Sequence, residues 1–183
     1  MSESLQTLVQ AARQNDERSW DILFRRYQLP LYSYAHGVVG AREAAFDVVQ
    51  ETFSRALVHI GSLRDDSKFG SWLFGIAHQA CLRQFRSWKR DDAVFDTEAE
   101  PTDHAAGADH PLSLLLSSED AGRLYELVDT LPLPQRSALL LHVLGDATIE
   151  DIAAITGVPP GTIKSRLFTA KRALRVLITE ARP

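Results

Sequence analysis

Residues 148–174, TIEDIAAITGVPPGTIKSRLFTAKRAL, carry the strongest structural signal in the chain. Thr148 stands three residues before Asp151, the spacing of a helix-capping box, so a short helix is expected from Thr148 to Ile155. The following run, Gly157–Gly161, holds two prolines between glycines and predicts a turn. A longer helix should follow, with its apolar face formed by Ile163, Leu167, Ala170, Leu174 and Leu177. This order predicts a helix-turn-helix, preceded by a helix over residues 133–144.

The last predicted helix is strongly basic. Between residues 160 and 175 it has no Asp or Glu, and its cations are Lys164, Arg166, Lys171, Arg172 and Arg175. Such a face suits a phosphate backbone. Thr162, Ser165 and Thr169 add small polar groups that suit base edges in a major groove. DNA binding is therefore favoured over the alternative, a solvated basic face on a structural helix.

The first 90 residues also predict helices, and no alternating strand pattern competes with them. Three apolar stripes with spacings of three and four residues run through Trp20–Tyr34, Phe46–Ile60 and Phe69–Trp88. Pro30 should kink the first helix, and Gly61 should end the second. The predicted fold class is all-α.

Charge divides the chain into two mildly basic parts around an acidic segment. Residues 1–90 contain 12 Lys/Arg and 9 Asp/Glu, residues 91–120 contain no Lys/Arg and 9 Asp/Glu, and residues 121–183 contain 8 Lys/Arg and 6 Asp/Glu. The net charge of −4 therefore does not argue against nucleic-acid binding, because the parts on either side of the acidic segment each carry a net positive charge. Residues 91–110 lack apolar periodicity, which predicts a flexible linker. We expect helical domains at 1–90 and 112–183, joined by a flexible acidic linker at 91–111.

Two polar clusters in the first domain suggest binding surfaces. Cations near its end, Arg83, Arg86, Lys89 and Arg90, alternate with aromatic residues, a combination that suits single-stranded DNA. The alternative is that most of these aromatic side chains fill the core. A second cluster, Asp47, Gln50, Glu51 and Ser54, shares one helical face and suits a protein partner. Taken alone, this second cluster is more typical of a solvated surface.

Other functional classes have little support. His78 and Cys81 form half a metal-binding pair with no second pair to complete it, so we expect neither a metal nor another cofactor. No nucleophile motif and no phosphate-binding glycine loop points to an enzyme. No apolar run is long enough to insert in a membrane, and no secretory signal is evident. Cys81, the only cysteine, suits a reducing cytoplasm.

Several motifs resemble one known family. In the first domain these are FRRY at 24–27, LY at 31–32, DVVQETF at 47–53 and KFGSWLFGIA at 68–77. In the second they are LPLPQR at 131–136, IA at 152–153, GTIKSRL at 161–167 and AKRAL at 170–174. The chain resembles the extracytoplasmic-function sigma factors of bacterial RNA polymerase, the first set matching their region 2 and the second their region 4.

The resemblance implies three binding surfaces. The residues matching the helix that docks on the clamp of the largest polymerase subunit are Asp47, Gln50, Glu51 and Phe53. The residues matching the part that opens and reads the −10 element are Lys68, Trp72, His78, Gln79, Arg83 and Arg86. The residues matching the −35 reader are Thr162, Lys164, Ser165, Arg166, Phe168, Thr169, Lys171 and Arg172. The implied partners are core polymerase, through its clamp and flap, promoter DNA in duplex and melted form, and an anti-sigma factor.

The sequence departs from the family pattern at a few positions. Gln79 stands where Asn is usual, Phe46 replaces a usual acid, Gly70 and Gly75 replace usual basic residues, and Arg83 stands where an acid is common. Two other functions fit parts of the sequence. A stand-alone helix-turn-helix regulator would bind duplex DNA without polymerase, but would leave the aromatic and basic stretch 69–90 without a role. A helical interaction protein that has lost DNA binding conflicts with the intact basic helix.

Overall fold

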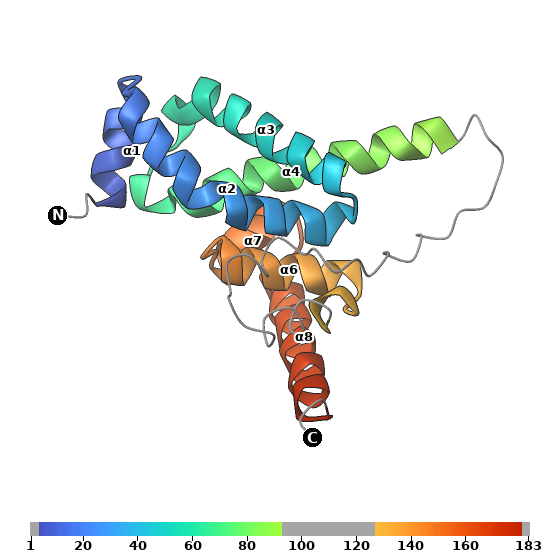
Figure 1. Ribbon diagram of the computed structural model, residues 1–183. Coiled ribbons are helices and arrows are strands. Elements are labelled where there is room, and N and C mark those ends of the chain that lie inside the picture. Colours follow the sequence, from blue (N-terminus) through green and yellow to red (C-terminus); the bar gives the residue numbers. More distant parts are fainter. Residues whose placement is uncertain (1–3, 93–126, 181–183) are drawn as a thin grey trace.

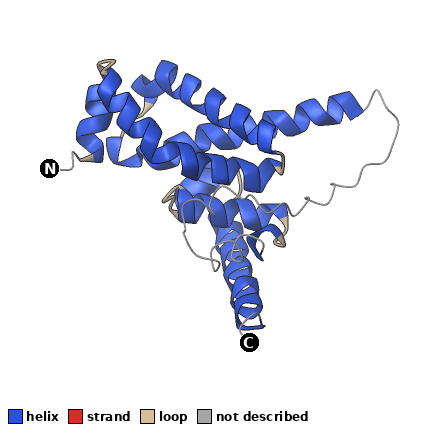
Figure 2. Cartoon of the chain, in the orientation of Figure 1, coloured by secondary structure: helices blue, strands red, loops and turns tan. Residues whose placement is uncertain are grey.

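Helices form every regular element in the part of the chain that the structure describes (Figure 2). The structure, a computed structural model, describes residues 4–92 and 127–180, and it places side chains over residues 4–85 and 127–175. The predicted all-α fold is confirmed. Apart from Asp91 and Asp92, which end a helix, the predicted linker 91–111 lies outside the described residues.

The N-terminal part consists of α1 (Leu5–Arg13), α2 (Glu17–Val39), α3 (Arg42–His59) and α4 (Phe69–Asp92), with short 3-10 turns at Ile60–Ser62 and Asp66–Lys68. Asp16 caps α2 by accepting a hydrogen bond from Ser19 N at 2.8 Å, and Gly40 ends it in the left-handed conformation. The helix continues through Pro30 without interruption. One turn after Pro30, the hydroxyl of Ser33 donates a hydrogen bond to the backbone oxygen of Leu29 at 2.9 Å.

The second predicted stripe was partly wrong. Phe46 and Leu57 are exposed, whereas Val49, Phe53 and Ile60 of the same stripe are buried. The buried face of α3 is shifted toward Ala45, Val48, Thr52 and Ala56. Gly61 does not cap α3 either. The helix ends at His59, and Gly61 lies inside the following 3-10 turn without a left-handed backbone.

The C-terminal part contains α6 (Leu133–Leu144), α7 (Ile149–Thr156) and α8 (Pro160–Glu180). The predicted capping box at Thr148 and Asp151 is confirmed, since each residue's side chain bonds the backbone N–H of the other. The turn between α7 and α8 is shorter than predicted. Gly157 takes the left-handed conformation, but Pro160 already begins α8, where a missing N–H costs no helical hydrogen bond.

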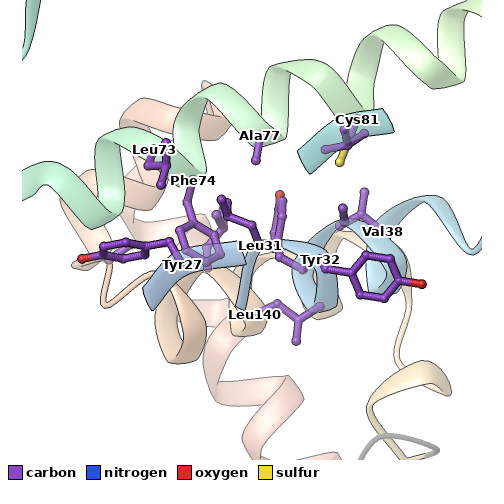
Figure 3. Packing of buried hydrophobic residues seen from close by; sticks show 14 of the residues in the cluster. Tyr27, Leu31, Tyr32, Val38, Leu73, Phe74, Ala77, Cys81 and Leu140 are labelled. Atoms are coloured by element: carbon purple, nitrogen blue, oxygen red, sulfur yellow. The ribbon is translucent and has the colours of Figure 1, made fainter. Parts of the chain in front are cut away.

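One apolar core extends through both parts. In Figure 1, α6 and α7 lie beneath α2 and α4, and α8 extends away from them. In Figure 3, Leu140 of α6 lies below Leu31 of α2, and Phe74 of α4 points down toward the C-terminal helices. All three side chains are buried. The packing therefore brings two segments that are separated by an acidic stretch of sequence into direct contact.

Candidate nucleic-acid and polymerase interfaces

The α7–α8 pair is a complete helix-turn-helix. Ile152 of α7 and Ile163 of α8 are fully buried, and Leu167 and Ala170 continue the inward face of α8 as predicted. The side chain of Leu177 lies outside the described residues. This packing fixes which side of α8 faces solvent.

The outward side of α8 carries the predicted −35 residues. Thr162, Lys164, Ser165, Phe168, Lys171 and Arg172 are exposed, and Arg166 and Thr169 are half-buried. Phe168 is 68 % exposed, so its ring is available to a ligand. Apolar side chains at a DNA-facing position contact thymine methyl groups, and the neighbouring cations suit phosphates. The surface has the composition of a major-groove reader.

The predicted −10 residues, which lie on α4 and just before it, differ in their exposure: some are open to solvent and others pair with residues of the protein. Gln79 is exposed and Trp72 is half-buried, so both offer atoms to a ligand. His78 is only 8 % exposed, and its Nδ1 lies 2.7 Å from Tyr34 Oη. Lys68 Nζ lies 2.8 Å from Asp151 Oδ2, on the capping box of α7. The side chain of Arg86 lies outside the described residues.

The predicted docking face on α3 is formed mainly by polar side chains. Asp47 and Gln50 are exposed, whereas Phe53 is buried with its ring centroid 4.7 Å from that of Phe24. Glu51 Oε1 lies 2.9 Å from both Arg55 Nε and Arg83 Nη2. A residue predicted for −10 DNA thus forms an ion pair with a residue predicted for polymerase.

Electrostatics at the contact between the two parts follow from burial and pairing. Burial raises the pKa of Asp151, but hydrogen bonds from Lys68 and Thr148 outweigh it, and the net effect lowers the pKa below 3.8. The same hydrogen bond raises the pKa of Lys68 above 10.5. Burial lowers the pKa of His78 and raises that of Tyr34, so both side chains are neutral at pH 7.

Comparisons with known proteins identify the family. The model for sigma-70 region 2 matches residues 23–91, and that for sigma-70 region 4 matches residues 121–174. The RNA polymerase sigma-H factor of Pseudomonas aeruginosa is 32% identical, with 96% of each chain covered. The ECF RNA polymerase sigma-E factor of Escherichia coli is also 32% identical, with 95% of each chain covered.

This chain belongs to the extracytoplasmic-function sigma factors. Solved structures agree. The sigma factor RpoE in complex with the anti-sigma factor NepR, from Bartonella quintana, matches with a TM-score of 0.63 and 27% identity, covering 88% of this chain and 99% of that one. CnrH in complex with the cytosolic domain of CnrY matches with a TM-score of 0.60 at 20% identity, covering 96% of this chain and 97% of that one, which shows the shared fold. The region 2 and region 4 resemblance is confirmed, region 2 being the matched residues 23–91 and region 4 the matched residues 121–174.

Two residues of this sigma factor were missed by the sequence prediction. Tyr34 bonds His78 and lies 3.3 Å from Ser137 Oγ of region 4, and Asp151 pairs with Lys68 of region 2. The apolar spacing placed Tyr34 on an inward face without indicating a hydrogen-bond partner. The capping box assigned Asp151 a role within α7 only, and nothing in the sequence indicated its ion pair with Lys68.

The described part of the sigma factor shows neither a cluster of metal ligands nor a membrane-spanning helix. Among residues 4–92 and 127–180, no three His, Cys, Asp or Glu side chains gather as metal ligands do. No helix in the same ranges combines the length and apolar character that a membrane span requires.

His78 gives a pH prediction. Because its folded-state pKa lies below the ordinary 6.5, its stabilising contribution is fully present above pH 6.5 and is lost as the pH falls through the folded-state value. We expect the free energy of unfolding of the wild type to decrease from pH 7 to pH 5 more steeply than that of His78→Gln. Urea denaturation at each pH measures both, and parallel curves would contradict the prediction. Asp151 titrates below 3.8, outside this window.

Proposed function

We propose that this sigma factor binds core RNA polymerase and directs promoter-specific transcription initiation, with α8 reading the −35 element and α4 the −10 element. The observation that carries the proposal is the basic, solvent-exposed face of α8, which has no acid from residue 160 to residue 175. This face lies on a complete helix-turn-helix, in a chain that aligns nearly end to end with sigma factors. Polymerase supplies the chemistry, so the chain acts as an initiation factor and not as an enzyme.

The three surfaces divide this work. Asp47 and Gln50, with Glu51 beside them, form the face that docks on the clamp of the largest polymerase subunit, while region 4 reaches the flap. Trp72 and Gln79 meet the melted strand, and Lys164, Ser165 and Phe168 meet the duplex. The domains are 1–90 and 112–183, and the acidic segment 91–111 is a tether that raises the local concentration of the second reader.

Regulation and location follow from the same assignment. The relative RpoE was solved with the anti-sigma factor NepR. We expect a protein of that class to hold this chain inactive as well. A factor that serves bacterial polymerase acts in the cytoplasm.

A binding comparison separates this function from the stand-alone regulator. A duplex library of genomic upstream fragments is incubated with the chain alone, with core polymerase alone, and with both. We expect selective retention of fragments only when both are present, because polymerase fixes the spacing of the two readers. Nanomolar selective binding by the chain alone, unchanged by polymerase, would favour the stand-alone regulator.

Gln79 provides a local test of the −10 assignment. Its side chain is exposed on α4 and presents both a hydrogen-bond donor and an acceptor to an unpaired base. Gln79→Ala is expected to slow open-complex formation about fivefold, since one or two hydrogen bonds are lost. Permanganate footprinting of the melted bases measures the rate. Gln14→Ala, at an exposed site after α1, is the control, and equal rates for the two variants would contradict the assignment.

A further inference from the structure

The turn between α3 and α4, residues 60–68, is held by a side chain from α1. Nη2 of Arg13, the last residue of α1, donates one hydrogen bond to Leu63 O and another to Asp66 Oδ1, the second at 2.6 Å. The side chains of Arg13 and Asp66 are 27 % and 17 % exposed, so this ion pair is partly shielded from water. A shielded pair that also bonds a backbone carbonyl restricts the turn more than an ion pair on the open surface would.

The rest of the turn is fixed by its own bonds. Asp65 Oδ1 accepts hydrogen bonds from the backbone N–H of Ser67 at 2.9 Å and from its hydroxyl at 2.6 Å. Leu63 is buried, and its N–H donates to Ile60 O at 3.2 Å. Arg64, between these anchored positions, is exposed and forms no ion pair with any other residue that the structure describes. An ordered turn therefore presents one cation to solvent.

Aromatic contacts connect α1 to the surface assigned to −10 DNA. Trp20 Nε1 donates to the backbone oxygen of Ala12, the neighbour of Arg13, at 3.0 Å. The Trp20 ring centroid lies 6.5 Å from that of Phe69, which lies 5.8 Å from that of Trp72. Phe69 is fully buried, whereas Trp72 is half-buried and belongs to the proposed −10 surface. The helix α1 thus supports both the turn and the start of α4.

We propose that Arg13 is a positioning residue for promoter melting. By fixing the turn 60–68, it holds Arg64 where the guanidinium contacts a phosphate of the unpaired −10 strand, while Trp72 meets a base. A cation on the backbone beside an aromatic ring is how proteins hold single-stranded DNA. A turn that is already ordered in the free chain also loses less entropy on binding. The inference rests on the proposed function, and it gives a role to α1, which lies before the region 2 match at residues 23–91.

Substitutions at Arg13 test the positioning role in the holoenzyme. Arg13→Gln removes the ion pair, whereas the ammonium of Arg13→Lys has enough N–H groups to bond both Leu63 O and Asp66. We expect Arg13→Gln to slow open-complex formation about fivefold, and Arg13→Lys to restore most of the rate. Permanganate footprinting on promoter fragments that the wild-type holoenzyme retains measures the rate. The control is Asp21→Asn, which breaks the exposed ion pair with Arg25 and should match the wild type.

The salt dependence of DNA binding separates positioning from a general effect on stability. Each phosphate contact with a single strand contributes about 0.7 to the slope of log affinity against log salt concentration. We expect Arg64→Gln to reduce this slope by about 0.7 for holoenzyme binding to a fork with an unpaired −10 strand. Arg13→Gln should reduce it equally, although Arg13 is paired with Asp66. Arg64→Gln should have little further effect in the Arg13→Gln background, because both changes remove the same contact.

The outcomes distinguish the proposal from the function on which it rests. Equal rates of open-complex formation for Arg13→Gln and the wild type would overturn the positioning role, and so would a salt slope that Arg64→Gln leaves unchanged. Additive effects of the two substitutions, with a matching loss of affinity for core polymerase, would reduce Arg13 to a residue of structural importance only. A wild-type holoenzyme that opens none of the fragments would instead refute the proposed function.

Discussion

Lys164→Glu is expected to reduce transcription from a −35-dependent promoter by about ten- to a hundredfold. Lys164 is exposed in the second turn of α8, on a face that has no acid from residue 160 to 175. The change removes one attraction to DNA and introduces one repulsion. Losing a single base or phosphate contact costs about 1–3 kcal/mol, and each 1.4 kcal/mol corresponds to tenfold. In vitro transcription with the holoenzyme measures the effect.

The matched control for this change is Arg18→Glu. Arg18 is exposed in the first turn of α2, far from α8 in sequence, and the substitution alters the net charge by the same amount. A negative side chain also suits the start of a helix, so the fold should tolerate it. Equal losses in the two variants would indicate a general charge effect, and unchanged output from Lys164→Glu would remove this residue from the −35 surface.

Asp47→Lys is expected to weaken binding to core polymerase about tenfold and to leave the fold intact. Asp47 is exposed on α3 and forms no ion pair with any other residue in the described part of the chain, so the substitution breaks no salt bridge there. A docking face that is complementary to its partner loses affinity when a like charge replaces an opposite one. Competition with a labelled wild-type chain for core polymerase measures the affinity.

Glu51 is a less suitable site for this test, although the same face was predicted to include it. Its carboxylate pairs with Arg55 and Arg83, so Glu51→Lys would also set like charges against each other between α3 and α4. The control for Asp47→Lys is Glu17→Lys, which makes the same change of charge at an exposed site on α2. Competition curves that coincide for Asp47→Lys and the wild type would refute the docking face.

Local patterns predicted the elements accurately. The spacing of Ile163, Leu167 and Ala170 defined the inward face of α8, and the Thr148–Asp151 pair marked the start of α7. Both signals depend on neighbours within one or two helical turns, which is why sequence alone is sufficient. The prediction for α3 was less accurate. Phe46 and Leu57 follow the helical period, yet their side chains are exposed and lie outside the contact between α3 and its neighbouring helices.

Contacts between distant segments were not predictable from periodicity. His78 was grouped with the −10 residues, but its environment depends on Tyr34, 44 residues earlier. Lys68 pairs with Asp151, 83 residues later. The sequence between the two domains does not indicate how they pack against each other. Single-residue charge and spacing cannot encode such pairs. The solvent-exposed side of α8, by contrast, could be predicted, because the apolar spacing already defined the buried side of the same helix. The −35 role of its residues stays a prediction.

The most direct test of the account is multi-round transcription by purified core polymerase on a library of upstream fragments, with and without this chain. We expect initiation that depends on the chain, at fragments sharing two elements whose spacing is constant. We expect that initiation to be lost with Lys164→Glu but not with Arg18→Glu. Equal transcription with and without the chain, together with selective duplex binding by the chain alone, would contradict it.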